Sequence, residues 1–166
     1  MRKVYVNEKW CLGCHLCEYN CAFAATGEDN MYLALKDKEI RPKIRVEDDG
    51  KVMYAVSCRH CDDPICVKSC ISGALSKDEN GVVKIDKNKC IGCLTCVLVC
   101  PYGALVPNEG KPVTKCELCT DNNCKEPACV KGCPSGAKYF DDPGYLYHKS
   151  ELEEIYARPA KNETFL

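Results

Sequence analysis

The chain has 166 residues, a formal net charge of -1 and 17 cysteines, so about one residue in ten carries a thiol. A cysteine share this high indicates a disulfide scaffold or a metal protein, and the balanced charge excludes a general attraction to nucleic acid or an anionic membrane. No segment approaches the roughly 18 apolar residues of a membrane span, the N-terminus is not typical of a signal peptide, and an odd cysteine count leaves one thiol unpaired. We therefore expect a reduced, cytoplasmic metal protein.

The cysteines form four groups that reveal an internal repeat. The groups are Cys11, Cys14, Cys17 and Cys21; Cys58, Cys61, Cys66 and Cys70; Cys90, Cys93, Cys96 and Cys100; and Cys116, Cys119, Cys124, Cys129 and Cys133. The first and third share the spacing C-x2-C-x2-C-x3-C, whereas the second and fourth match each other around Pro64 and Pro127. Because this match aligns Cys129 with Cys66, sixteen cysteines make four sets of four.

In chain order, the first predicted element is a helix over residues 18–26 that ends at Gly27. Residues 40–57 predict a β-hairpin with a glycine-containing turn, which either packs over a metal centre or a partner or serves as plain structural cover. A second hairpin is expected in residues 76–85. Residues 94–99 predict one or two helical turns, stopped by the proline at position 101.

Two further helical turns and a C-terminal helix complete the predicted elements. Pro64 and Pro127 are placed as first-turn prolines of short helices usually are. Residues 141–166 are expected to form a C-terminal extension, with a short helix beginning at a capping box at Ser150. This helix either packs on the body of the chain or forms a docking arm for another subunit.

The cysteine spacing is typical of iron–sulfur clusters. A four-iron cubane takes one thiolate per iron, and in two-cluster ferredoxins the last cysteine of C-x2-C-x2-C-x3-C-P ligates the other cluster. Cys100 and Cys133 are followed by proline, whereas Cys21 and Cys70 are not. The third and fourth ligands of each group are four residues apart, so one helical turn places both on one face, between two clusters. Zinc is the alternative, but its sites usually use cysteine pairs with longer spacers.

Three other residues within these groups are not expected to be ligands. Cys124 lies in an insertion of the fourth group and is interpreted as a spare thiol, with an alternative ligand or a redox-sensing thiol as the other hypotheses. His15 and His60 lie between cysteines, where each either donates a hydrogen bond to cluster sulfur or faces solvent. Cysteine already fills every ligand position.

The segments Cys58 to Val67, Lys115 to Cys119 and Pro127 to Val130 resemble the iron–sulfur subunits of the dimethyl sulfoxide reductase type. Small soluble relatives of these subunits serve CO dehydrogenases, formate dehydrogenases and hydrogenases, and tungsten aldehyde oxidoreductases. The resemblance implies an α+β fold over residues 1–140, with short helices and β-hairpins. It also implies two pseudo-symmetric ferredoxin-like modules, each holding two [4Fe-4S] clusters.

The resemblance further implies how the ligands and modules are divided. Module one takes residues 1–30 and 107–140, module two takes residues 54–106, and residues 40–57 are a hairpin insertion. Four ligand sets follow: Cys11, Cys14, Cys17 and Cys133; Cys116, Cys119, Cys129 and Cys21; Cys58, Cys61, Cys66 and Cys100; and Cys90, Cys93, Cys96 and Cys70.

The expected function is electron transfer rather than catalysis. The sequence contains no G-x-G-x-x-G, no phosphate loop and no acid–base constellation beyond the cysteines. We therefore expect a hetero-oligomer in which four [4Fe-4S] clusters relay single electrons between a catalytic oxidoreductase subunit of one of the types named above and a second redox protein. The alternatives are a zinc-rich structural or binding module, a stand-alone polyferredoxin, and an enzyme with an open iron site.

Overall fold

The computed structural model describes residues 1–36, 41–108, 111–120 and 125–141. Its helices are short: α1 (Leu16–Ala24), α2 (Met31–Leu35), α3 (Ile65–Lys68), α4 (Thr95–Val99), α5 (Ala128–Lys131) and a 3-10 turn, η1 (Glu8–Trp10). Its strands are β1 (Lys3–Val6), β2 (Arg45–Asp48), β3 (Met53–Val56), β4 (Leu75–Lys77), β5 (Val83–Ile85), β6 (Leu105–Asn108), β7 (Lys111–Lys115) and β8 (Lys138–Asp141). The predicted α+β class, with short helices and β-hairpins, is confirmed.

The described strands pair as four antiparallel two-stranded sheets. Three of them, β2–β3, β4–β5 and β6–β7, join strands that follow each other in the chain. The fourth joins the two ends of the described chain, because β1 pairs with β8 and sets Val6 opposite Lys138. This long-range pair brings the segment before the first cysteine group next to the segment after the last one.

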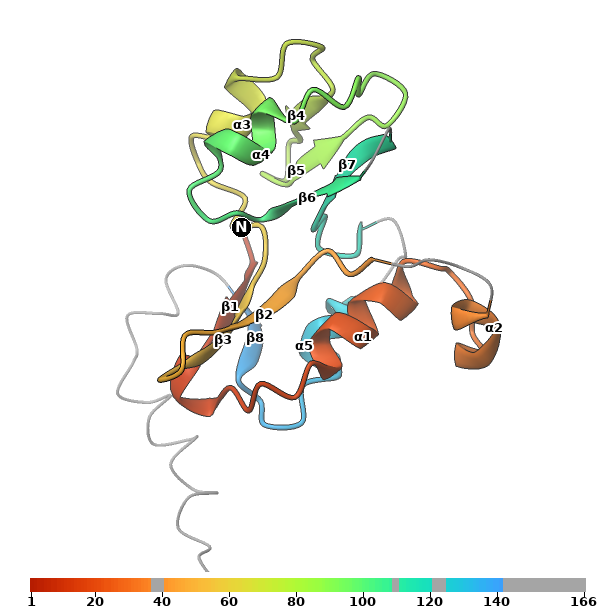
Figure 1. Ribbon diagram of the computed structural model, residues 1–166, viewed down its shortest axis with the longest axis vertical. Helices are drawn as coiled ribbons and strands as arrows, with labels where there is room; N and C mark the ends of the chain where they lie inside the picture. The colour runs from red at the N-terminus through yellow and green to blue at the C-terminus, as the bar shows by residue number, and fades with distance from the viewer. Residues whose placement is uncertain (37–40, 109–110, 121–124, 142–166) are drawn as a thin grey trace, which may run out of the picture.

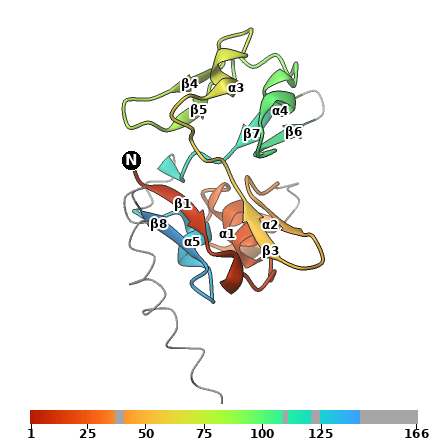
Figure 2. The same cartoon turned by 90° about the vertical axis from the view of Figure 1, so that its left-hand side faces the viewer.

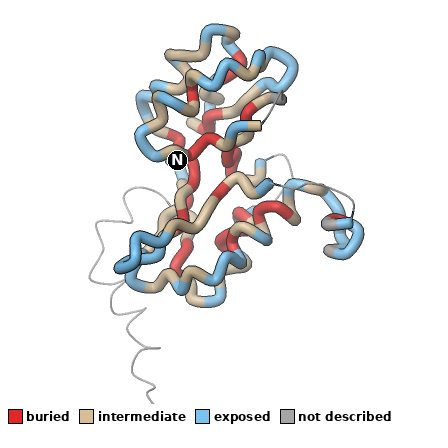
Figure 3. The backbone as a smooth tube through the Cα atoms, in the orientation of Figure 1, coloured by how far each residue is buried: buried red, intermediate tan, exposed pale blue. Residues whose placement is uncertain are grey.

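The elements form two lobes that meet near the N-terminus (Figure 1). The upper lobe contains α3, β4, β5, α4, β6 and β7, and the lower lobe contains β1, α1, α2, β2, β3, α5 and β8; the view turned by 90° keeps the same division (Figure 2). The upper lobe has a core of its own around Leu75, Val83, Cys96, Leu105 and Val113. Buried backbone also runs through the junction of the lobes and along the inner side of α1 (Figure 3).

The predicted elements agree with the structure in type, with shifts at their ends. The predicted helix over residues 18–26 begins two residues earlier, at Leu16, and its chain then turns at Gly27, where φ is +69°. Both predicted hairpins form, as β2–β3 and β4–β5. Pro64 and Pro127 each immediately precede a helix, at the N-cap. The C-terminal helix and Cys124 lie outside the described residues.

Helix α2 and the β6–β7 hairpin are not predicted by the sequence patterns. Asn30 caps α2, because its side-chain Oδ1 accepts the backbone N–H groups of Tyr32 at 2.9 Å and Leu33 at 3.3 Å. Strand β6 of this hairpin contains residues 106 and 107, where module two is predicted to end and the second part of module one to begin. The division into modules stays a prediction.

Candidate functional site

The cysteines lie on four similar loop-and-helix units. In each unit the third cysteine is in a helix and the fourth lies in the same helix or within two residues of its end: Cys17 and Cys21 in α1, Cys66 and Cys70 at α3, Cys96 and Cys100 at α4, and Cys129 and Cys133 at α5. All sixteen described cysteines are free thiols. Cys14 and Cys93 are exposed, whereas Cys58, Cys116 and Cys129 are buried. The units therefore share one arrangement of cysteines on a loop and a helix, but individual cysteines are buried to different extents.

The loops share an unusual backbone conformation. The residue before the second cysteine of each group has a left-handed φ: +62° at Gly13, +45° at His60, +71° at Gly92 and +58° at Leu118. An αR–αL alternation turns successive backbone N–H groups toward one concavity, which suits an anionic group. The glycines at positions 13 and 92 are the signal that the sequence offers for this conformation, and His60 and Leu118 give none.

Backbone N–H groups also point at individual sulfur atoms. Cys21 Sγ accepts the N–H of Lys43 at 3.3 Å, Cys100 Sγ accepts that of Ala104 at 3.5 Å, and Cys116 Sγ accepts that of Leu118 at 3.5 Å. Such donors stabilise a thiolate, which is the form of cysteine that binds metal. Soft thiolates, buried surroundings and N–H donors together fit an iron–sulfur cluster.

Electrostatic effects show which thiols the structure brings together in the lower lobe. Burial and the nearby thiolates of Cys116, Cys21 and Cys119 raise the pKa of Cys129 to about 12, although Lys138 lowers it. Burial also raises the pKa of Cys17, and the nearby thiolate of Cys11 raises it further. Three of the neighbours of Cys129 thus come from the fourth group and the end of the first.

Two further sets appear in the second and third groups. Burial, followed by the nearby thiolates of Cys70, Cys90 and Cys93, raises the pKa of Cys96 to about 11. Burial likewise raises the pKa of Cys58, with contributions from Cys100 and Cys61.

A link between the lobes runs through Cys116. Burial raises its pKa to about 12, and the thiolates of both Cys21 and Cys58 contribute. In the part of the chain that is described, no three His, Cys, Asp or Glu side chains converge closely enough to hold a single metal ion.

The two histidines within the groups differ. His60 is fully buried, and its Nδ1 accepts the backbone N–H of Val83 at 3.0 Å. Burial, and after it the charge of Lys115, lowers the pKa of His60 to about 3, so its ring is neutral. The solvent-facing alternative is therefore wrong for His60. His15 is exposed, and its Nδ1 lies 2.8 Å from Glu18 Oε2.

Sequence reasoning did not identify three buried charged side chains close to the cysteine groups. Lys115 and Lys138 are 1% and 4% exposed, and Glu117 is 7% exposed. Lys115 Nζ donates to the carbonyl oxygens of Val83 and Cys116. One signal was available, because the repeat places Lys138 where the related segments carry leucine.

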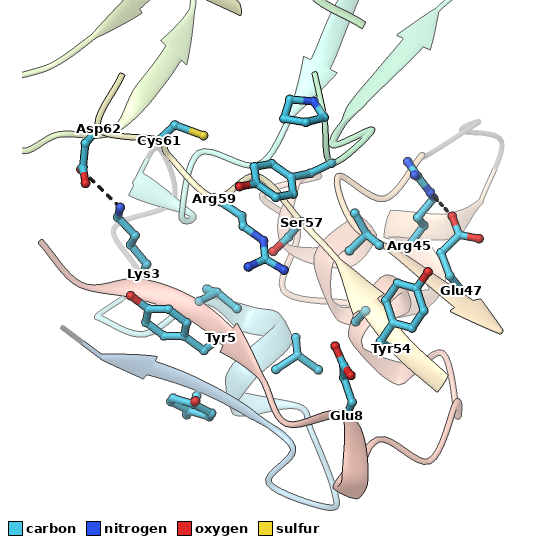
Figure 4. A pocket seen from close by; sticks show the side chains of 17 residues that line it. Lys3, Tyr5, Glu8, Arg45, Glu47, Tyr54, Ser57, Arg59, Cys61 and Asp62 are labelled. Carbon is cyan, nitrogen blue, oxygen red and sulfur yellow. Dashed lines mark hydrogen bonds and ion pairs between the residues drawn. The ribbon is translucent and has the colours of Figure 1, made fainter. Parts of the chain in front are cut away.

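A cavity of about 840 Å³ lies where the lobes meet (Figure 4). Lys3, Arg45 and Arg59 line it together with acidic and aromatic side chains, and Cys61 is its one cysteine. The ammonium of Lys3 lies 3.4 Å from Asp62 Oδ1, and the Arg59 guanidinium lies 4.8 Å from the ring centre of Tyr102. The basic side chains are thus already engaged by neighbouring groups.

Clustered thiols on short helices, with N–H donors directed at their sulfur atoms, define an iron–sulfur protein. Residues 50–143 match the family model of the 4Fe-4S dicluster domain, and the chain belongs to this family. No helix among the described residues is long and apolar enough to cross a membrane.

Individual relatives in Escherichia coli K12 agree with this assignment. The protein is 36% identical over 159 residues to the B subunit of the anaerobic dimethyl sulfoxide reductase, covering 82% of this protein and 71% of that subunit, so the resemblance seen in the sequence is confirmed. It is 36% identical over 144 residues to the oxidoreductase AegA, but spans only 21% of that protein's length. Among solved structures, the active-site complex BamBC of benzoyl-CoA reductase includes a polypeptide that is 20% identical, with a TM-score of 0.43 and 98% of both polypeptides covered.

Proposed function

We propose that this chain is an electron-transfer subunit that relays single electrons through four [4Fe-4S] clusters. The observation that carries the proposal is the placement of the cysteines on four similar helical units, with mutual electrostatic effects that agree with the ligand sets implied by the family resemblance. Cys129 with Cys116, Cys119 and Cys21 is a complete set of this kind. A bound cluster supplies a one-electron redox couple. The chain's residues hold it, surround it with N–H donors and keep water away.

The proposed ligand sets each combine three cysteines of one group with the last cysteine of another. They are Cys11, Cys14, Cys17 and Cys133; Cys116, Cys119, Cys129 and Cys21; Cys58, Cys61, Cys66 and Cys100; and Cys90, Cys93, Cys96 and Cys70. The mutual effects on the pKa values support all four members of the second set. In the third set they connect Cys66 with Cys58 and Cys100. In the fourth set they connect Cys96 with Cys70, Cys90 and Cys93. In the first set they link Cys17 with Cys11. Two ferredoxin-like modules follow from these exchanges.

The same contacts support a linear order for the clusters. Cys116 is influenced by Cys21 and by Cys58, so the fourth-group and second-group sites adjoin at the junction of the lobes. The first-group and third-group sites are then the ends of the series of clusters. Their second ligands, Cys14 and Cys93, are exposed, whereas the second ligands of the other two groups, Cys61 and Cys119, are intermediate in exposure. More exposed ends suit electron exchange with partners, and less exposed central sites suit relay between them.

The partners form the least constrained part of the proposal. We infer a catalytic oxidoreductase subunit, of the CO dehydrogenase, formate dehydrogenase, hydrogenase or tungsten aldehyde oxidoreductase type, and a second redox protein. The similarity to a subunit of dimethyl sulfoxide reductase supports a role beside a catalytic subunit. A cytoplasmic location belongs to the same proposal and is supported by sixteen free thiols.

Metal analysis tests the function directly. The protein, purified without oxygen, is expected to hold about sixteen iron and sixteen sulfide per chain, as four cubanes require, and a broad visible charge-transfer absorption. Appreciable zinc without this absorption would overturn the proposal in favour of a zinc module. A content of about eight iron would retain an iron–sulfur protein but contradict the four ligand sets.

Two serine variants test the assignment of the fourth group. Cys129→Ser removes a proposed ligand and should lower the iron content by about a quarter or more, because one cubane holds four of about sixteen irons. Cys124→Ser is the matched control and should leave iron content unchanged. The reverse result would show that Cys124, not Cys129, completes the set.

A further inference from the structure

Lys138 is a buried charge without a partner. It is the first residue of β8, its side chain is only 4% exposed, and its Nζ has no hydrogen-bond partner among the described residues. Moving an ammonium group out of water costs several kcal/mol unless an opposite charge compensates it. The protein groups around Lys138 do not supply this compensation through a hydrogen bond. An anionic group that is not part of the polypeptide is therefore the expected partner.

The internal repeat shows that lysine is unusual at this position. Three segments run from the last cysteine of a group through Gly-Ala to the first residue of a strand: Cys70 to Leu75, Cys100 to Leu105, and Cys133 to Lys138. Leu75 and Leu105 are 4% and 3% exposed and belong to the core of the upper lobe. Lys138 occupies the same place, equally buried, in the lower lobe. A leucine there would fill the core without the cost of desolvating a charge.

The position of Lys138 relates it to two clusters at once. Its strand follows Cys133, and its partner across the sheet, Val6, leads into the first cysteine group. The charge of Lys138 lowers the pKa values of Cys17, Cys21 and Cys129, against the larger effect of burial. Cys17 belongs to one proposed ligand set, and Cys21 and Cys129 belong to the next. Together with its burial and its pairing with Val6, these effects place Lys138 near both lower-lobe sites.

Lys115 provides a useful contrast within the same molecule. It is also buried, but its Nζ donates to two backbone carbonyl oxygens, those of Val83 and Cys116. Its ammonium is thus already satisfied by the protein. Lys138, in contrast, has no such hydrogen bond, so its charge remains available to interact with a cluster.

We propose that Lys138 tunes the two lower-lobe clusters, raising the reduction potential of each relative to the leucine found elsewhere in the repeat. The inference rests on the proposed function, because it needs those clusters. On reduction, one electron from a one-electron donor enters a cluster and makes it more negative by one charge; no bond forms or breaks, and no proton is transferred. A nearby fixed positive charge stabilises the more negative form, which makes reduction easier.

Redox titration of the holoprotein tests this proposal. Potentials are measured anaerobically by following the EPR signals of the reduced clusters. Lys138→Leu should make two of the four clusters harder to reduce, shifting their reduced-to-oxidised ratio at a fixed potential by about tenfold, which corresponds to about 59 mV for a one-electron couple. Lys138→Arg should keep the potentials near those of the natural protein. Lys51→Leu, which removes an exposed lysine in the turn between β2 and β3, away from the cysteine groups, is the matched control and should shift nothing.

Each outcome decides the proposal. Iron and sulfide are measured first, so a natural protein without four clusters refutes the proposed function rather than the tuning. With four clusters present, unchanged potentials in Lys138→Leu overturn the tuning. If Lys138→Leu loses iron, Lys138→Met, which keeps an unbranched chain, carries the same measurement. Loss of iron in both neutral variants would show a role in assembly and overturn the tuning.

Discussion

Glu117 joins the two lobes at the centre of the molecule, and its replacement is the sharpest test of how they are held together. Its side chain is 8% exposed. One carboxylate oxygen, Oε1, accepts the backbone N–H of Ile85 from β5 at 2.9 Å, and the other, Oε2, lies 3.8 Å from Lys43 Nζ. We expect Glu117→Ala to loosen the junction and so to expose the central clusters.

The contacts set the size of the effect. A hydrogen bond to a charged group contributes about 1.5–3 kcal/mol, and a buried N–H left without an acceptor costs about 1–3 kcal/mol. Glu117→Ala removes both the hydrogen bond and the ion pair, so we expect a loss of about 3 kcal/mol. Glu117→Gln keeps an oxygen for the Ile85 N–H and loses only the pair with Lys43, whose side chain is 25% exposed, so we expect about 1 kcal/mol.

The assay is the rate at which the holoprotein loses its visible cluster absorption in urea, because cofactor loss makes unfolding irreversible. A loss of about 3 kcal/mol corresponds to at most roughly a 160-fold faster rate, and about 1 kcal/mol to roughly fivefold. Glu79→Ala removes an exposed acid and should leave the rate nearly unchanged. Equal rates for Glu117→Ala and Glu117→Gln would refute the role assigned to the Ile85 hydrogen bond.

Two further predictions concern packing and the cofactors. A Cβ at Gly132 would lie 2.2 Å from Asn20 Nδ2 and 2.5 Å from its Cγ, so Gly132→Ala should speed cluster loss by an amount equivalent to about 1–3 kcal/mol. In the double variant, Asn20→Ala should restore most of the lost stability. Additive losses in the double variant would contradict the contact. Removing iron with acid and a chelator should abolish most native far-UV circular dichroism, because five of the twelve residues in the larger buried cluster, which spans both lobes, are cysteines. A native spectrum in the apoprotein would contradict this dependence.

Local chemistry explains why much of the fold could be predicted from the sequence. The third and fourth ligands are four residues apart, which suits a helical turn, and α1, α3, α4 and α5 form there. The hairpins β2–β3 and β4–β5 were recognisable because strand-like residues flank turns that contain Gly50 and Gly81. The dicluster family was recognisable for the same reason, since cysteine spacing is itself a local pattern.

The remaining features depend on contacts between distant segments. The pairing of β1 with β8 joins opposite ends of the described chain, and neither four-residue strand has a sequence pattern that identifies its partner. The burial of Lys138 follows from that pairing, so composition alone would assign this lysine to the surface. Similarly, His60 could not be placed from its sequence neighbours, because Val83 of β5 provides the N–H that its ring accepts.

The left-handed position in the four loops connects the repeat to the depth of each site. The loops nearest the surface use glycine, at Gly13 and Gly92, where a positive φ carries little penalty. The second and fourth loops use His60 and Leu118, at a cost of about 1–2 kcal/mol for each non-glycine residue in this conformation. Both side chains are buried, at 0% and 4% exposure, so the apolar burial of Leu118 and the hydrogen bond of His60 offset that cost. The repeat thus retains a left-handed residue before the second cysteine of all four loops, while the side chain at this position differs between exposed and buried loops.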